Sequence, residues 1–295
     1  VPSPSMKEFK DKVAVVTGGA SGLGLAMARR FAAEGMKLVL ADVEEEALRR
    51  VELEFRKAGV PVIGIWTDVS RSQDIERLAE KTLATFGAVH VLCNNAGVAP
   101  GGAMWENTVA DWEWVLGVNV WGVIHGVRTF LPIMLRQDAE CHVVNTASVA
   151  GLLSVPNMGI YCVSKHAVVT LSECLHHDLA QRRAKVGVSL LCPAYVPTGI
   201  IDSERNRPAL LRNPPRTKTA EEVAREEQMR HAVLSGRITA EQVADKVFEA
   251  VRDQRFYILT HPKIKGAIQA RMDDILLERQ PTDMSRPGDM SKPGA

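Results

Sequence analysis

The sequence predicts an α/β protein built on a single doubly wound parallel sheet with helices on both faces. Short runs of β-branched and other apolar residues alternate with longer helical patterns from residue 13 onward, as in chains whose parallel strands are joined by crossover helices. A glycine-rich turn follows the first run and opens the first helical pattern. Neither a repeat nor a linker interrupts residues 10–200, so we expect one domain with its ligands at the carboxyl ends of the strands.

The expected strands are short runs rich in valine, isoleucine and leucine. In chain order they are residues 13–17, 37–41, 60–66, 89–93, 142–145, 186–191 and 256–260. The helical patterns between them are illustrated by residues 22–34, where Leu25, Ala28 and Ala32 share one face and Gly35 supplies the stop. A second clear helical pattern covers residues 239–252, just before the last expected strand.

Three segments depart from this alternation. Residues 1–9 are expected to be a flexible leader in front of a main domain at residues 10–280. Residues 281–295 are rich in proline, glycine and serine, which predicts a disordered tail. Between the sixth expected strand and the helix at 239–252, residues 197–237 form a long charged insertion whose second half has a helical pattern.

Composition and charge argue against several classes of protein. The chain of 295 residues is 46% hydrophobic, and its 36 basic and 35 acidic residues give a net charge of +1. We therefore expect no binding to nucleic acid, and we find no run of ~18 uncharged apolar residues that would span a membrane. The five cysteines are odd in number, widely spaced and mostly in apolar runs, which indicates reduced thiols in a cytoplasmic protein and no metal site.

The glycine-rich turn at residues 17–24 predicts a phosphate-binding loop. Gly18, Gly22 and Gly24 permit a tight turn and allow the backbone to approach a pyrophosphate, whose charge is favoured by the N–H groups at the start of the next helix. Their spacing, Gly-x-x-x-Gly-x-Gly, differs from that of the usual dinucleotide fingerprint. A purely structural connection is the alternative interpretation.

Asp42 ends the second expected strand, about twenty residues after the glycines. A carboxylate there can accept hydrogen bonds from both hydroxyls of an adenosine ribose, and it would repel a 2′-phosphate. Neither Ser21 nor Val43 supplies a compensating cation. The residue therefore favours NAD over NADP, although it could also cap the helix that follows.

Taken in order, these motifs resemble the series that characterises the short-chain dehydrogenase/reductase family. The series continues with Asp68-Val69, Asn94-Asn95-Ala96-Gly97, Asn119, Ser148, Tyr161-x-x-x-Lys165, and Pro193 with Thr198. The resemblance implies a Rossmann-type oxidoreductase that uses NAD, with residues 197–237 as a lid over the substrate. The cofactor contacts that it implies come from Gly18, Ser21, Gly22, Leu23, Gly24, Asp42, Asp68, Val69, Asn95, Ala96, Gly97, Tyr161, Lys165, Pro193, Val196 and Thr198. One departure is Ala194, where the family usually has glycine.

The catalytic residues implied by the resemblance are Asn119, Ser148, Tyr161 and Lys165. A ketone that accepts a hydride builds negative charge on its oxygen, which calls for a hydrogen-bond donor, here Ser148, and an acid, here Tyr161. We expect the Lys165 ammonium and the charge of oxidised nicotinamide to lower the pKa of Tyr161 from about 10 toward neutrality. Asn119 is implied to hold a water and to complete a proton path from Lys165.

The sequence leaves the substrate open. A secondary alcohol or ketone is the first hypothesis. A 3-oxoacyl thioester is the runner-up, because five cations in the lid could meet its phosphates; they are Arg205, Arg207, Arg212, Arg216 and Lys218. A solvated loop would carry the same charges.

Other features also have two interpretations. Outside the enzymes, the alternative is a non-catalytic NAD-binding protein of the same fold. Four tryptophans between residues 105 and 121 could wall an aromatic substrate pocket or belong to core or subunit contacts. The resemblance further implies a homotetramer, with one interface along the helices that carry Asn119 and Lys165 and another near residues 256–260.

Overall fold

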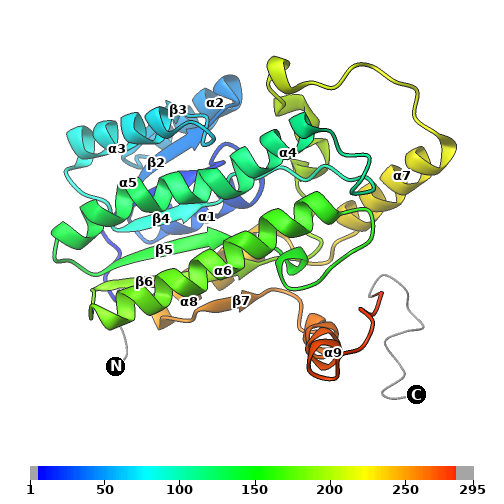
Figure 1. Ribbon diagram of the computed structural model, residues 1–295. Coiled ribbons are helices and arrows are strands. Elements are labelled where there is room, and N and C mark those ends of the chain that lie inside the picture. The colour runs from blue at the N-terminus through cyan, green and yellow to red at the C-terminus, as the bar shows by residue number, and fades with distance from the viewer. Residues whose placement is uncertain (1–5, 284–295) are drawn as a thin grey trace.

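The computed structural model describes residues 6–283, and the sheet they form is the one that the sequence predicts. Its seven strands are all parallel and lie in the order β3-β2-β1-β4-β5-β6-β7 (Figure 1). In chain order they are β1 (Val13–Thr17), β2 (Lys37–Asp42), β3 (Val62–Trp66), β4 (Val91–Asn94), β5 (Cys141–Thr146), β6 (Val186–Cys192) and β7 (Tyr257–Leu259). Strand order reverses between β1 and β4, which opens a crevice at the carboxyl ends of these strands.

Helices cover both faces of the sheet, so the doubly wound fold class is confirmed. The α-helices of the described residues are α1 (Gly22–Ala33), α2 (Glu45–Lys57), α3 (Ser72–Phe86), α4 (Val109–Leu116), α5 (Gly122–Arg136), α6 (Gly159–Gln181), α7 (Ala220–Leu234), α8 (Ala240–Asp253) and α9 (Ile264–Leu276). One core cluster packs α1, α2 and α8 on one face, through residues such as Phe31, Phe55 and Val247. The other packs α3, α5 and α6 on the opposite face, which is in front in Figure 1.

Most strand boundaries agree with the expected ones, and the exceptions have local causes. The third strand begins at Val62 rather than residue 60, directly after Pro61, which has no N–H for the sheet. The fourth begins at Val91 rather than residue 89. There the side-chain amide of Gln137 takes both backbone groups of Val89, accepting from its N–H at 2.8 Å and donating to its carbonyl at 2.7 Å.

A single continuous helix, Val109–Arg136, runs through α4 and α5. Its middle, Gly117–Trp121, is a π-helical turn that contains Asn119. Among the described residues it is also the one helix that is long and apolar enough to cross a membrane by length and composition, whereas we expected none. Core helices of soluble proteins pass the same test, and here Phe130 and Met134 pack in the core beneath the sheet.

The two ends of the described chain show where sequence patterns were insufficient. Met6 and Phe9 are buried, and Phe9 packs on Phe248 of α8, so these two side chains belong to the core although they fall in the flexible leader expected at residues 1–9. After β7 the chain forms α9, which the sequence analysis did not predict and which lies outside the layered body in Figure 1. Residues 1–5 and 284–295, including most of the expected tail, lie outside the described residues.

Candidate active site

A cleft lies at the carboxyl ends of the strands, where the crevice between β1 and β4 opens. Most of the residues that we expected to contact a cofactor line it: Gly18, Ser21, Gly22, Leu23, Asp42, Asp68, Val69, Asn95, Ala96, Gly97, Tyr161, Lys165, Pro193 and Thr198. Gly24 and Val196 do not line it; Gly24 lies behind the turn and Val196 is buried in the core. Loops far apart in the sequence thus meet in one elongated site.

The glycine-rich turn has the tight geometry that its sequence predicts. Gly18 and Gly22 have φ of +63° and +51°, in the left-handed region that glycine adopts without strain. A side chain at Gly24 would overlap the carbonyl oxygen of Gly18, so only glycine lets the first turn of α1 pack against the loop. The N-terminus of α1 therefore faces the cleft with a closely wound backbone, the arrangement that favours an anion.

Asp42 is fixed at the end of β2 by two backbone groups. One carboxylate oxygen accepts from the N–H of Ala20 and the other from the N–H of Glu44, each at 3.0 Å. Burial raises the pKa of Asp42 above its ordinary value, against the lowering effect of these two hydrogen bonds. Each oxygen keeps acceptor capacity toward the cleft, so the side chain can receive two hydroxyl groups.

The loop after β4 is joined to β1 through Thr17, whose positioning role the sequence analysis missed. The Thr17 hydroxyl accepts from the N–H groups of Asn95 and Ala96 at 2.9 and 3.1 Å, and the Asn95 amide donates to the Thr17 carbonyl at 3.0 Å. A threonine directly before the glycine turn was the available signal. These bonds hold the Asn95-Ala96-Gly97 segment along the floor of the cleft.

Tyr161 and Lys165 line the other end of the cleft, Ser148 lies beside Tyr161 without lining it, and all three side chains are buried. The Lys165 ammonium lies 5.7 Å from the centre of the Tyr161 ring and donates to the Thr146 carbonyl at 2.9 Å. Ser148 is close enough to Tyr161 for a hydrogen bond, and its hydroxyl also accepts from the N–H of Ala150. The helix α6 thus presents Tyr161 and Lys165 on one face toward the end of β5, as their spacing predicts.

Burial dominates the proton affinities of this group, contrary to the expectation for Tyr161. It raises the pKa of Tyr161 to about 12, against the lowering effect of the Ser148 hydrogen bond. It lowers the pKa of Lys165 to about 8, with the nearby Cys192 acting weakly in the opposite direction. In the protein alone, therefore, the phenol is a weaker acid than free tyrosine, and Lys165 does not offset this.

Asn119 lies behind the cleft and is 1% exposed. Its amide oxygen accepts from the N–H of Val98, and its amide nitrogen donates to the Val98 carbonyl and to the Ser164 hydroxyl, all at 2.9–3.0 Å. The π-helical turn aims the amide at these partners, which ties the loop after β4 to α6. A side chain at Gly97 would contact both Asn119 and Lys165, so the backbone of Gly97 separates the two.

The first part of the lid consists of two short 3₁₀ segments, Gly199–Asn206 and Ala209–Leu211. Its buried Ser203 accepts a hydrogen bond from the N–H of Ala99, which joins the lid to the loop after β4. Ala194, the departure from the family pattern, does not adopt a positive φ, so the methyl group causes no left-handed strain. Thr198 and residues of both 3₁₀ segments line the cleft.

Four of the five lid cations are paired within the protein. Arg205 bonds Glu44, Arg207 bonds Asp111, Arg216 bonds Glu222 and Lys218 bonds Glu226. The tryptophans separate as well: Trp114 lines the cleft, whereas Trp105 and Trp121 are 86% and 50% exposed. The hypothesis that the four tryptophans form the wall of one pocket is therefore wrong. Of the four, only Trp114 lines the cleft.

The described residues contain no cluster of three or more side chains able to hold a metal ion. All five cysteines of the sequence lie within the described region and carry free thiols, and only Cys174 among them is exposed.

Comparison with known proteins identifies the family. The family model of the short chain dehydrogenases matches residues 12–209, so the chain belongs to the short-chain dehydrogenase/reductase family and is an oxidoreductase of that family. Among curated relatives, the "CLA biosynthesis dehydrogenase/reductase" of Lactiplantibacillus plantarum is 33% identical over 94% of this chain and 97% of its own. The "C alpha-dehydrogenase" of a Sphingobium strain is 32% identical over 92% of this chain and 87% of its own.

Solved structures agree. A short-chain dehydrogenase/reductase from Burkholderia phymatum, crystallised in complex with NAD, superimposes with a TM-score of 0.92 at 56% identity, covering 94% of this chain and 99% of that one. A short-chain dehydrogenase from Novosphingobium aromaticivorans superimposes with a TM-score of 0.77 at 31% identity, covering 96% and 92%.

Proposed function

We propose that the protein is an NAD-dependent dehydrogenase that interconverts a secondary alcohol and its ketone. The observation that carries the proposal is the layout of the cleft, which has the glycine turn and Asp42 at one end and Tyr161 and Lys165 at the other, with the buried Ser148 beside Tyr161. A dinucleotide is the cofactor whose two halves would occupy both ends. The NAD complex of the Burkholderia phymatum structure supports the same choice.

The residues of the cleft fit NAD in size, charge and hydrogen bonding. The glycine turn leaves room for a pyrophosphate against the N-terminus of α1, and Asp42 offers two acceptor oxygens for ribose hydroxyls. Asp68, Val69 and the Asn95-Ala96-Gly97 segment would contact the adenine and the middle of the cofactor, and Thr198 the carboxamide. Lys165 and Tyr161 would hold the nicotinamide ribose. When bound, the nicotinamide would supply or accept the hydride.

In the proposed mechanism Tyr161 moves the proton that accompanies the hydride. The phenol would donate to the forming alkoxide during ketone reduction, and the phenolate would accept the hydroxyl proton during alcohol oxidation. Ser148 would donate a hydrogen bond to the same oxygen, which stabilises the charge that develops there. With the cofactor bound, the oxidised nicotinamide would add its positive charge to that of Lys165, and the two together would bring the pKa of Tyr161 down from about 12, its value in the protein alone.

The substrate proposal stays with a simple alcohol or ketone. The thioester hypothesis depended on free cations in the lid, and four of the five are paired with carboxylates of the protein. Only Arg212 among them forms no ion pair with a residue that the structure describes, and it is exposed. Saturable turnover of a 3-oxoacyl thioester, far better than that of simple ketones, would restore that alternative.

The test replaces Tyr161 by phenylalanine and measures two quantities. Turnover across a panel of alcohols with NAD and of ketones with NADH should fall by at least about 10²–10⁴, the usual contribution of a general acid or base. NADH affinity, measured by fluorescence titration, should change little. Near-normal turnover of the variant would contradict the mechanism. Tight NADH binding by the wild type with no turnover of any panel member would favour a non-catalytic NAD-binding protein.

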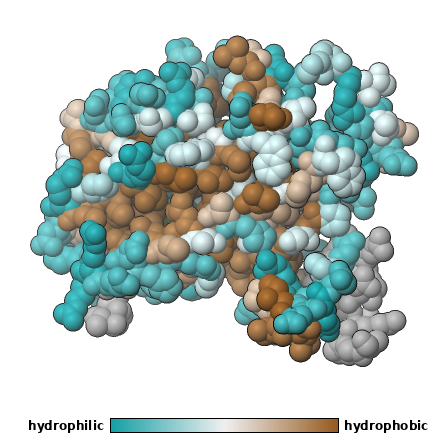
Figure 2. Space-filling view, viewed as in Figure 1, coloured by the Kyte–Doolittle hydropathy of each residue, from teal (hydrophilic) through white to brown (hydrophobic). Residues whose placement is uncertain are grey.

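We also propose that the protein is a cytoplasmic homotetramer. The support is the apolar face formed by α5 and α6, seen as the brown area across the front of the molecule in Figure 2. Trp121 and Val163 are exposed on this helical layer, at 50% and 44%. Residues 256–260 would lie near a second interface. Light scattering coupled to gel filtration measures the mass, and a monomer at micromolar concentration would contradict the proposal.

A further inference from the structure

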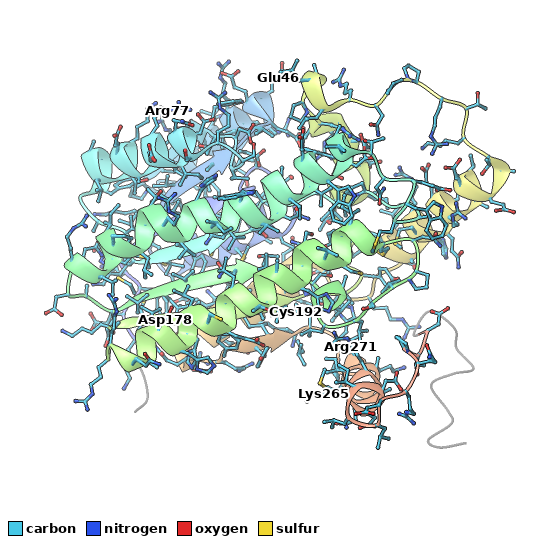
Figure 3. All side chains as sticks on the ribbon, viewed as in Figure 1. Glu46, Arg77, Asp178, Cys192, Lys265 and Arg271 are labelled. Carbon is cyan, nitrogen blue, oxygen red and sulfur yellow. The ribbon has the colours of Figure 1, made fainter. Side chains whose placement is uncertain are left out.

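The first part of the lid spans the cleft and forms an ion pair with each of its two walls. On one side, Arg207 forms an ion pair of 2.7 Å with Asp111, and its guanidinium lies 5.0 Å from the centre of the Trp114 ring. On the other side, Arg205 reaches the residue that precedes α2, Glu44. Two arginines separated by one residue thus point to opposite walls of the cleft. Figure 3 marks the α2 wall by Glu46, beside the pale yellow lid.

The bonds at Glu44 converge on one carboxylate oxygen. Arg205 donates to it at 2.6 Å and Asn206 at 2.9 Å. A second guanidinium nitrogen of Arg205 donates to the carbonyls of Gly199 and Asp202, both at 2.9 Å, which stiffens the lid segment that Arg205 carries. Glu44, Arg205 and Asn206 all line the cleft, so this cluster closes it at the surface.

Glu44 is also linked to the end of the cleft where Asp42 lies. Its backbone N–H donates to the Asp42 carboxylate at 3.0 Å, while its side chain holds the lid. Its side chain does not cap α2, because no side-chain capping bond forms there. The carboxylate of Glu44 therefore has a contact with the lid as its main interaction.

The two ion pairs that hold the lid differ in burial. The side chains of Arg207 and Asp111 are 3% and 9% exposed, so separating them would leave charges in a poorly solvated place. Those of Arg205 and Glu44 are 40% and 28% exposed, and water can replace their mutual contacts at modest cost. Separating the lid from Glu44 is therefore less costly than separating it from Asp111.

We propose that Glu44 is a positioning residue that latches the lid, through Arg205 and Asn206, over the adenosine end of the cofactor site. The latch sets the rate at which the dinucleotide leaves. This inference rests on the proposed use of NAD. The cofactor would enter and leave past the open Glu44 side while Arg207 keeps the lid attached to α4. Glu44 itself takes no part in the chemical step.

The experiment measures NADH release from the full-length protein without substrate. Stopped-flow fluorescence follows NADH displaced by excess NAD from the wild type, Glu44→Ala, Arg205→Met and the double variant. We expect each single variant to release NADH roughly three- to tenfold faster, the range for a partly exposed ion pair with one added hydrogen bond. The double variant should be no faster than either single variant, because both remove the same contact.

The matched control is Glu45→Ala. Glu45 is the next residue, it pairs with Arg49 on the exposed side of α2 and it does not line the cleft. Its release rate should equal that of the wild type. A second readout needs no cofactor: amide hydrogen exchange of residues 199–206 should be faster in Glu44→Ala than in Glu45→Ala.

The outcomes are distinct. Absence of an NADH signal in the wild type would contradict the proposed function itself. NADH binding with unchanged release in the single variants would overturn the latch. Independent, multiplicative effects of Glu44→Ala and Arg205→Met would overturn it as well. Faster release without faster exchange in the lid would show that Glu44 acts on the cofactor directly, which also contradicts the latch.

Discussion

The Lys165 ammonium donates to the main-chain carbonyl of Thr146 at 2.9 Å and has no carboxylate partner among the described residues. A neutral carbonyl offsets only a small part of the free energy that is needed to remove a cation from water. This uncompensated desolvation explains why the pKa of Lys165 falls to about 8. The charge is thus kept available for the cleft at the expense of stability.

Replacing Lys165 by methionine should therefore stabilise the fold while removing activity. Below pH 8 the folded wild type holds a proton that burial disfavours, so the variant should be more stable by roughly 1–3 kcal/mol at pH 7. Between pH 8 and 10.5 the unfolded wild type binds more protons than the folded one, so wild-type stability rises and the difference narrows. Urea unfolding at several pH values measures this. A variant less stable than the wild type at pH 7 would contradict it.

The pH dependence of turnover should report Tyr161. Alcohol oxidation needs the phenolate, so kcat/KM for the alcohol at saturating NAD should rise with pH; ketone reduction needs the phenol and should fall. The controlling pKa should lie below about 12, the value that burial gives Tyr161 in the protein alone. In Lys165→Arg, which keeps a cation but misplaces it, the profile should move to higher pH. Profiles that coincide for the two proteins would argue against Lys165 as the group that tunes Tyr161.

Asp42 should decide between the two nicotinamide cofactors. Asp42→Ser removes the carboxylate that accepts ribose hydroxyls and repels a 2′-phosphate. We expect kcat/KM with NAD to fall roughly 10–100-fold and kcat/KM with NADP to rise. Initial rates with both cofactors and one alcohol measure the ratio. Wild-type turnover with NADP equal to that with NAD would make the Asp42 argument wrong.

The buried anchor of the lid should contribute far more stability than its exposed pairs. Arg207→Met removes the cation that pairs with the Asp111 carboxylate, which within residues 6–283 keeps hydrogen bonds from Asn213 and Thr108, and should cost roughly 3–5 kcal/mol in the free energy of unfolding. Arg230→Gln breaks an exposed pair with Asp202, which water screens, and should cost far less. Urea unfolding compares the two variants. Equal costs would mean that burial of the Arg207 pair carries no extra stability.

Local patterns were sufficient to predict the sheet and the residues along its carboxyl edge. Strands such as Val13–Thr17 are buried on both faces and read as continuous apolar runs, and the glycine turn lies between such a run and a helix. Because parallel strands place their ends together, residues as distant as Gly18 and Asp42 could be assigned to one cleft, whereas Tyr161, which lies on a helix, was assigned to it by the family resemblance. The order of the motifs added the roles that spacing alone does not give.

Contacts between distant segments could not be predicted in this way. Glu44 and Arg205 are separated by 161 positions, and nothing in either local sequence indicates the pair. The burial of Phe9 depends on an aromatic contact with Phe248 of α8, which a short apolar signal near the N-terminus does not reveal. The high pKa of Tyr161 results from the depth of its site, where Ala150 and the loop residue Ala99 belong to the apolar cluster around it.

The π-helical turn at Gly117–Trp121 makes helix length as critical as helix composition. Such a turn carries one residue more than a regular α-helical turn. Deleting one residue there would leave a well-bonded helix, yet α4 would rotate relative to α5 by about 100°, the angle between successive residues. Asn119 would turn away from Val98, and Trp114 away from the cleft. Along this helix, evolution and protein engineering can thus exchange side chains much more freely than they can change the number of residues.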